Sequence, residues 1–362
     1  MMKKNNKNKV LAIWIALLAT ASPIMTYFIL DRLEFFNNPS ETVIEPDNSS
    51  KKELLGPTAI KIKSMIPQLD ESMYRGYLEK LCSFGPHPTA RRLAYKLFDL
   101  PIEKVANYIY SEFESMGLQV RYQHWEEEPT IGNLMKPVYH PGWQVGDNVE
   151  ATLPGTNTSS DEVYVLVAHY DTMNMLGSND KSFKVLGAND DSSGVAALLS
   201  IAKLMSRYSF NHTVRFVAVS GEEQGLMGSD AYAKEAKQNN DNIVVAFSVD
   251  MIGTTPPYNM SNEVIFAGDI DNKPSSIVDF TVGVNQRYSE FLNFKISRDN
   301  PMKHGSDQKS FIKYGYNAVY VAEPVLDKDW HRRSDTIENM DISYATDVTR
   351  LLLATVTELA WS

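Results

Sequence analysis

Two patterns of hydrophobic positions alternate along the chain from residue 70 onward. In some stretches apolar residues recur at helical spacing, which favours amphipathic helices, and in others short β-branched runs are typical of buried strands. The sequence predicts helices at 70–84, 102–116, 195–208, 226–237 and 342–361, and strands at 149–153, 162–168, 213–219, 243–249, 264–267 and 318–322. Such alternation predicts a sheet covered by helices on both faces.

The N-terminal segment has a different pattern. An apolar run without charge occupies residues 10–30, and four lysines precede it. Its length favours a membrane-spanning helix, and the lysines favour a cytoplasmic N-terminus. The alternative is a cleaved signal peptide, because the small residues at 19–21 resemble a cleavage site.

Both interpretations export the remainder of the chain. With an uncleaved anchor, we expect a single-pass membrane protein with an extracytoplasmic domain; with cleavage, a secreted one. The expected organisation is a cytoplasmic basic segment at 1–9, an anchor at 10–30, a polar linker at 31–66 and a folded domain at 67–362.

Composition narrows the choice of partners. The formal net charge of −10 argues against nucleic acid, because phosphate binding needs a basic surface. Cys82 is the single cysteine, so no intrachain disulfide is possible and stability must come from the core or from a metal. Nothing in the composition indicates an oligomeric state.

Polar side chains follow several of the predicted strands. His169 and Asp171 come directly after the strand at 162–168, and residues two apart in an extended segment point the same way. Asp250 follows an almost wholly apolar strand, where a carboxylate should be solvated or bound to something. His331 comes after the last predicted strand. Taken alone, each also fits a polar strand end or an exposed loop.

Two pairs of adjacent acids precede predicted helices. Asp190 and Asp191 lie in a glycine-bounded loop, and Glu222 and Glu223 follow the strand at 213–219. Acids are favoured at helix N-termini in any case. Two adjacent glutamates repel one another, however, and a nearby cation would relieve this. One acid could then bind metal while its neighbour acts as a base.

In α/β folds, side chains at the carboxyl ends of neighbouring strands gather at one place. Imidazole and carboxylate groups are the usual zinc ligands in hydrolases. Several such groups after successive strands therefore predict a metal site.

These residues resemble metallopeptidase family 28, the di-zinc exopeptidases of the aminopeptidase type. Five motifs match in order: AHYD at 168–171, GANDDSSG at 187–194, GEEQGLMGS at 221–229, VDMIG at 249–253 and HRRSDT at 331–336. The similarity runs from about residue 70 to the C-terminus. It implies a single three-layer α/β/α domain around a mixed, mostly parallel sheet.

The resemblance also implies a role for each side chain. His169, Asp190 and Asp250 would hold one Zn²⁺ ion. Asp190, Glu223 and His331 would hold a second, with Asp190 bridging the two ions.

Two further carboxylates have implied roles. Asp171 would orient His169, and Glu222 would act as general base. The expected activity is hydrolysis of the N-terminal peptide bond of peptides or proteins by a water that two zinc ions activate.

One motif departs from the family pattern. The segment GSDQKSF at 305–311 carries Gln308 where histidine is usual. Lys303 and His304, just before it, are candidate donors to an oxyanion, although an exposed lysine or histidine is usually only solvated.

Other functions stay open at this point. Glutaminyl-peptide cyclotransferases share the fold and similar His and acid positions, but act as acyltransferases. A non-catalytic receptor-like ectodomain on this fold is a third possibility, although such relatives typically lose ligands. Carboxypeptidase or dipeptidase specificity is also open.

Overall fold

The computed structural model describes residues 43–44, 56–91, 100–127, 144–173, 185–255, 262–268, 276–298 and 305–362. The chain divides into a unit of residues 1–42 and a unit of residues 43–362, and every described residue belongs to the second. No helix among the described residues is long and apolar enough to cross a membrane. The anchor at 10–30 lies outside those residues, so it stays a prediction.

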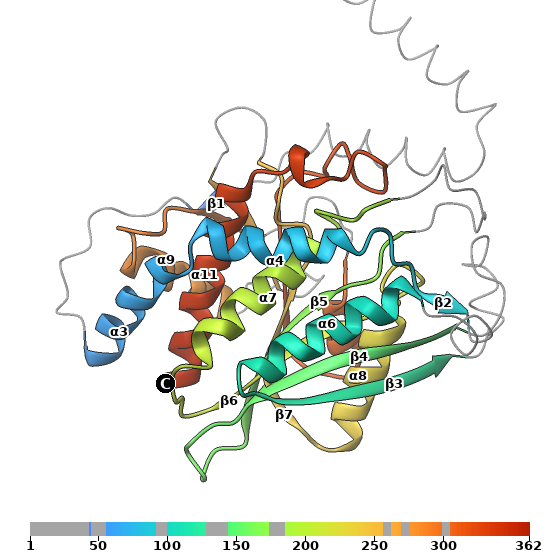
Figure 1. Ribbon diagram of the computed structural model, residues 1–362. Coiled ribbons are helices and arrows are strands. Elements are labelled where there is room, and N and C mark those ends of the chain that lie inside the picture. The colour runs from blue at the N-terminus through green and yellow to red at the C-terminus, as the bar shows by residue number, and fades with distance from the viewer. Residues whose placement is uncertain are drawn as a thin grey trace, which may run out of the picture. The chain divides into compact units, whose positions relative to one another are not determined.

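The elements run in the following order (Figure 1): β1 (Val43–Ile44), α3 (Pro57–Met65), η1 (Ile66–Gln68), α4 (Glu71–Ser83), β2 (Ala90–Arg91), α6 (Pro101–Ser115), β3 (Gln119–Glu127), β4 (Gln144–Leu153), β5 (Glu162–His169), α7 (Ser192–Met205), β6 (Thr213–Val219), α8 (Met227–Gln238), β7 (Asn242–Val249), β8 (Glu263–Ala267), α9 (Ser276–Arg287), β9 (Lys295–Ser297), α10 (Gln308–Lys313), β10 (Ala318–Ala322), η3 (Ile337–Asn339) and α11 (Ile342–Trp361).

The strands form one mixed sheet in the order β1-β9-β8-β10-β7-β5-β6-β4-β2, with β3 paired to β4. The central strands β10, β7, β5 and β6 are parallel to one another. Outside this centre, β8 and β9 are parallel, and the remaining pairings are antiparallel. The expected mixed sheet is confirmed, but the expectation of a mostly parallel sheet was wrong. The long hairpin of β3 and β4 and the reversed β8 cause the difference, since strands joined this way pair antiparallel.

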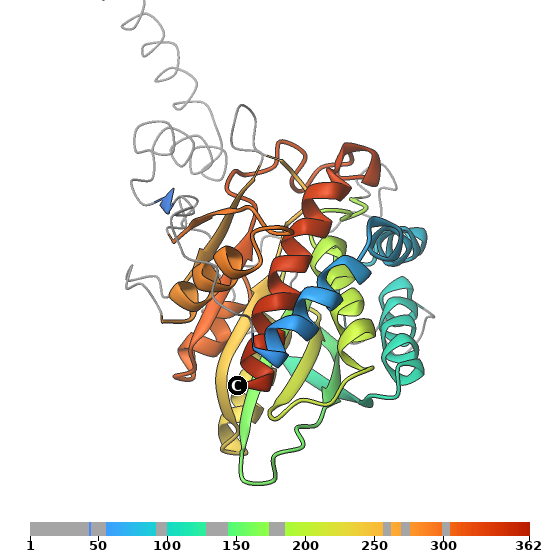
Figure 2. The ribbon, with the colours of Figure 1, turned by 90° about the vertical axis from the view of Figure 1, so that its left-hand side faces the viewer.

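Helices cover both faces of the sheet, and the alternation along β5 shows why. Val163, Val165 and Val167 pack in a cluster with α8 and α10. Tyr164 and Leu166 point the opposite way, into the larger core under α4, α6, α7 and α11. Figure 2 shows α7 between the sheet and helix α4, and α7 contacts both β5 and α4. Thirteen of the fourteen residues of α7 are buried, which explains its nearly continuous apolar sequence.

The folded domain begins earlier than residue 67. Helix α3 lies against α11 (Figure 2), and its Ile62 and Met65 are completely buried. Pro57 stands at the first turn, where a missing backbone N–H costs nothing. The C-terminal part of the predicted linker therefore belongs to the core, because its apolar residues lie on one face of a helix.

The carboxyl ends of the parallel strands meet at one edge of the sheet. His169 ends β5 and lies beside Val219, the last residue of β6. The next residue after β7, Asp250, donates its backbone N–H to Val321 of β10. This edge therefore receives the polar segments that follow all four central strands, as expected for an α/β sheet.

Candidate metal centre

Asp190 lies between two imidazoles. Its Oδ1 is 3.1 Å from Nε2 of His169, and its Oδ2 is 3.1 Å from Nε2 of His331. One carboxylate therefore turns a different oxygen toward each histidine. Burial opposes ionisation of Asp190, but the two imidazoles outweigh it and hold the pKa of this carboxyl below its usual range.

A further carboxylate stands beside each imidazole. Oδ1 of Asp250 is 3.8 Å from Nε2 of His169, and Oε2 of Glu223 is 3.1 Å from Nε2 of His331. The five predicted ligands thus form two half-sites that share Asp190. All five side chains are buried or nearly so.

The donor atoms fit divalent metal ions. Nε2 of His169, Oδ1 of Asp250 and Oε1 of Glu223 are buried, and none has a hydrogen-bond partner among the described residues. A buried polar atom without a partner is costly, and coordination to a cation would satisfy it. Two imidazoles with three carboxylates are a ligand set that zinc accepts.

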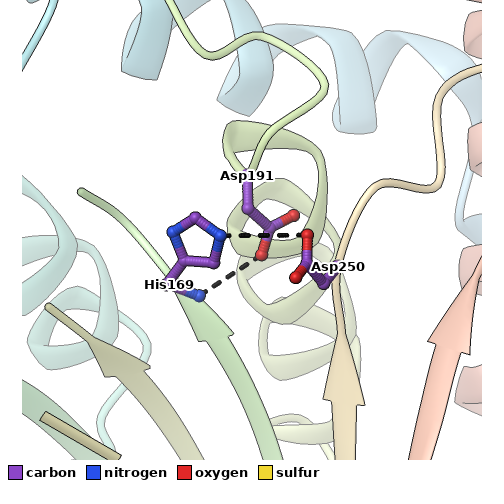
Figure 3. Close-up of side chains that lie close together, drawn as sticks. All are labelled: His169, Asp191 and Asp250. Atoms are coloured by element: carbon purple, nitrogen blue, oxygen red, sulfur yellow. Dashed lines mark hydrogen bonds and ion pairs between the residues drawn. The ribbon is translucent and has the colours of Figure 1, made fainter. Parts of the chain in front are cut away.

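Asp191 also lies close to one half-site. Its ligand atom and those of His169 and Asp250 are within 4.8 Å of one another (Figure 3). Its oxygens, however, accept hydrogen bonds from the backbone N–H groups of Gly194 at 2.8 Å and of His169 at 3.3 Å. It also caps the N-terminus of α7. These bonds favour a supporting role for Asp191, and the ligand role of Asp190 stays a prediction.

Asp171 lies behind His169 and is completely buried. Nδ1 of His169 is 3.0 Å from the backbone carbonyl oxygen of Asp171 and 3.7 Å from its Oδ1. The same carboxylate accepts the backbone N–H groups of Glu222 and Glu223 at 3.2 and 3.4 Å. Asp171 therefore contacts both a histidine and the loop with the paired glutamates, and its orienting role stays a prediction.

The paired glutamates have raised pKa values. Burial, together with Glu223, Asp307 and Asp250, raises the pKa of Glu222 well above its ordinary value, although His169 opposes this. Burial also raises the pKa of Glu223 to about 6, with Asp190 adding to the shift and His331 opposing it. Crowding of several buried carboxylates raises these pKa values, and a cation held among them would favour the charged forms.

A second layer of hydrogen bonds holds the loop that contains Asp190. The carboxylate of Asp335 accepts the backbone N–H of Asn189 at 2.7 Å and that of Asp190 at 3.2 Å. Because Asp335 lies four residues after His331, one loop both presents a histidine and holds the backbone of Asp190. The side chain of Asn189 accepts the backbone N–H of Gly253 at 2.8 Å, which connects it to the loop after Asp250.

His331 has a constrained environment. Its backbone is left-handed, with φ of 56°, which is unfavourable for a residue with a Cβ atom. The ring of Trp330 stacks on its imidazole, with the centroids 3.9 Å apart. Strained backbone that the surroundings maintain is typical of functional sites.

The motif that departs from the family pattern contributes a buried acid. Both carboxylate oxygens of Asp307 lack a hydrogen-bond partner among the described residues. Burial raises its pKa to about 7, and Asp250 and Asp171 add to this. Gln308 accepts the backbone N–H of Ser306 at 2.9 Å. Lys303 and His304 lie outside the described residues, so their proposed donor role stays a prediction.

The structure thus brings together the five predicted metal ligands with Asp171 and Glu222, whereas Lys303 and His304 lie outside the described residues. The sequence interpretation assigned no role to Asn189, Asp191, Asp307 or Asp335, although each falls within a quoted motif. Their positions in those motifs were the available signal.

Comparison with known proteins agrees with this geometry. The chain is 27% identical over 248 residues to a "Probable zinc metalloprotease" of Pyrenophora tritici-repentis, covering 59% of this chain and 56% of that protein. It is 30% identical over 225 residues to a "Probable leucine aminopeptidase" of Arthroderma otae, covering 59% of this chain and 58% of that protein. The matched part therefore spans little more than half the length of these relatives.

Solved structures show the same fold. An aminopeptidase from Aneurinibacillus sp. strain AM-1 superposes with a TM-score of 0.64 at 16% identity, covering 83% of this chain and 96% of that one. A glutaminyl cyclase from Fimbriiglobus ruber superposes with a TM-score of 0.64 at 20% identity, covering 80% and 95%.

The model of one protein family matches residues 148–356, more than half of the chain and a range that includes both half-sites. The chain therefore belongs to peptidase family M28.

Proposed function

We propose that the chain is a zinc-dependent aminopeptidase that binds two metal ions. The observation that carries this proposal is the position of Asp190 between His169 and His331, with one carboxylate oxygen toward each imidazole. A carboxylate that turns one oxygen toward each of two imidazoles is well placed to bridge two cations held close together. The relative named as a leucine aminopeptidase and the aminopeptidase fold support the choice of substrate.

The ligands would be divided between two ions. His169 and Asp250 would hold one, Glu223 and His331 the other, and Asp190 both. Zinc bound in this way supplies Lewis acidity, which acidifies a water molecule and polarises a carbonyl group. Asp171 keeps the imidazole of His169 in orientation through the contact at Nδ1.

Glu222 would move the proton. Its backbone N–H donates to the carboxylate of Asp171 at 3.2 Å, which holds this residue beside the proposed ligands. Its own carboxylate would accept a proton from the attacking water and return it to the leaving amine.

A glutaminyl cyclase is the second candidate, because one such enzyme superposes as well as the aminopeptidase does. The two activities differ in product. An aminopeptidase releases a free amino acid, whereas a cyclase converts an N-terminal glutamine to pyroglutamate and releases ammonia.

We also propose that the N-terminal run at 10–30 anchors the domain on the extracytoplasmic side of a membrane. Its length and the preceding lysines support this. Fractionation of cells that express the full chain, with protease added from outside, would test it.

The test of function is a digest of unblocked, N-acetylated and N-glutaminyl peptides with the purified full chain. We expect release of the first residue from unblocked peptides, no cleavage of acetylated ones, and about two zinc ions per chain. Glu222→Gln should lower turnover at least about a hundredfold while zinc content is unchanged, because it removes a base and no ligand. Pyroglutamate formation alone, or full activity after complete removal of metal, would overturn the proposal.

A further inference from the structure

A segment that precedes the matched family region contacts the metal centre. Residues 85–89 lie between α4 and β2, and His87 and Thr89 are buried, with exposed fractions of 1% and 6%. The backbone N–H of His87 donates to Oγ1 of Thr172 at 3.0 Å, and the backbone N–H of Thr172 donates to the carbonyl oxygen of His87 at 3.4 Å. These reciprocal bonds fix the segment beside the chain that follows Asp171.

Thr89 donates a hydrogen bond to the carboxylate behind His169. Its Oγ1 is 3.0 Å from Oδ2 of Asp171. The other bonds to that carboxylate come from the backbone N–H groups of Glu222 and Glu223, and the bond from Glu223, at 3.4 Å, is long. Thr89 therefore supplies the one side-chain hydroxyl bond to Asp171 among the described residues, and it does so on a completely buried carboxylate.

We propose that Thr89 is a positioning residue of the catalytic site, acting through Asp171 on both His169 and the loop of Glu222. The proposal rests on the function proposed above. Hydrogen bonds to an ionised carboxylate are among the strongest in proteins. Nδ1 of His169 contacts the backbone carbonyl oxygen of Asp171 at 3.0 Å, and the carboxylate stands behind it with Oδ1 3.7 Å away. Without the hydroxyl, Oδ2 of Asp171 keeps only the long bond from Glu223, so this carboxylate is less firmly held beside the imidazole.

Loss of the Thr89 hydroxyl would therefore weaken metal binding and slow the chemical step. The orientation of an imidazole ligand and its basicity depend on the group behind it, and loss of such a group typically costs 10–100-fold in metal affinity or activity. Looser positioning of the Asp171 carboxylate would also displace the backbone of Glu222. A residue that only packs would change stability and leave these properties unaltered.

The experiment compares Thr89→Val, which keeps the shape and removes the hydroxyl, with Thr89→Ser, which keeps the donor. Thr355→Val is the matched control, because Thr355 is buried and donates only to Leu351 of its own helix in the described structure. It lies fourteen residues along α11 from Asp341, roughly 20 Å from the end that faces the site. Zinc affinity is measured by chelator competition without substrate, and kcat and KM on an aminoacyl chromogenic substrate.

We expect Thr89→Val to weaken zinc binding about tenfold and to lower kcat about tenfold with KM within twofold, while Thr89→Ser and Thr355→Val match the wild type. Thr89→Ala should behave as Thr89→Val does, and it serves in its place if the valine variant fails to fold. Wild-type zinc affinity and kcat in either variant lacking the hydroxyl would overturn the proposal. If the wild type binds zinc but releases no amino acid, the proposed function fails, and the zinc affinities still decide the role of Thr89.

Discussion

Asp190 and Asp191 show how two identical, adjacent side chains take different roles. The oxygens of Asp191 are occupied by backbone N–H groups, including that of Gly194 at 2.8 Å. Those of Asp190 face the imidazoles of His169 and His331. A carboxylate that already accepts several N–H bonds has little capacity left for a cation, whereas one that faces two imidazoles is placed to bridge two. The neighbours of each oxygen therefore determine the role.

This difference predicts the effect of Asp190→Asn. The amide keeps the size of the side chain but loses the charge that both half-sites share, so we expect zinc content to fall from about two ions to less than one and turnover to fall at least about a hundredfold. Metal analysis after dialysis against a weak chelator measures this. Asp70→Asn is the control, because Asp70 caps α4 and asparagine caps equally well. Two retained zinc ions in the Asp190 variant would contradict the bridging position.

At the scale of elements, the loop between β10 and α11 has two structural roles. It presents His331, and through Asp335 it holds the backbone of Asn189 and Asp190 at the start of α7. Burial raises the pKa of Asp335 to about 7, while the two backbone bonds oppose this shift. The bonds join segments about 145 residues apart in sequence, so the half-site of His331 forms only when both loops are in place.

We therefore predict that Asp335→Asn weakens zinc binding about tenfold, since an amide nitrogen would then face one of the two backbone N–H groups. A destabilisation of about 2 kcal/mol should accompany it, because a buried backbone N–H group that loses its acceptor keeps the cost of its desolvation. Isothermal titration with zinc and urea unfolding measure the two effects. Asp347→Asn is a suitable control on the neighbouring helix, since Asp347 is partly exposed and pairs with Arg350. Zinc affinity unchanged in the Asp335 variant would refute the role of this loop.

The helices and strands differ in how well the sequence predicted them. Strands β5, β6, β7 and β10 were predicted within about one residue, because each is an apolar run buried on both faces. Strand β3 was missed, since its residues are mostly polar and it pairs only with β4 at the edge of the sheet. The short β9 and α10 carry too few residues for a pattern to show.

The same limit applies to the site. The proposed metal ligands could be singled out because they follow strands or precede helices in recognisable motifs. The bonds of Thr89 and Asp335 could not, because they depend on how segments far apart in sequence pack together. Local patterns contain no information on such pairings until the tertiary fold is known.

At the scale of the whole molecule, a buried acid at the carboxyl end of a central strand makes stability depend on pH. Glu323 directly follows β10 and is completely buried. It accepts hydrogen bonds from the side chain of Asn189 at 3.1 Å and from the backbone N–H of Thr254 at 2.6 Å. Burial, with a further contribution from Asp327, raises its pKa well above the ordinary value of 4.5, although Asn189 and Thr254 oppose this.

Proton linkage determines whether the free energy of unfolding rises or falls with pH. The folded state keeps the proton of Glu323 to a higher pH than the unfolded state does, so unfolding releases a proton once the pH exceeds about 4.5. The free energy of unfolding should therefore fall as the pH rises from 4.5 toward the folded pKa, by about 1.4 kcal/mol for each pH unit from this group. Below 4.5 both states are protonated and the contribution is constant.

Glu323→Gln removes this titration and keeps a neutral side chain of the same shape. We expect the variant to gain stability relative to the wild type as the pH rises from 5 to 7, by up to about 3 kcal/mol. Urea unfolding of both proteins across that range, at saturating zinc, measures the difference, in which pH effects common to both proteins cancel. Glu290→Gln is the control, because Glu290 is half-exposed and pairs with Lys63 on the surface. A constant difference in the free energy of unfolding between the two proteins across this pH range would contradict the prediction. It would mean that the polar groups around Asn189 stabilise the ionised carboxylate of Glu323.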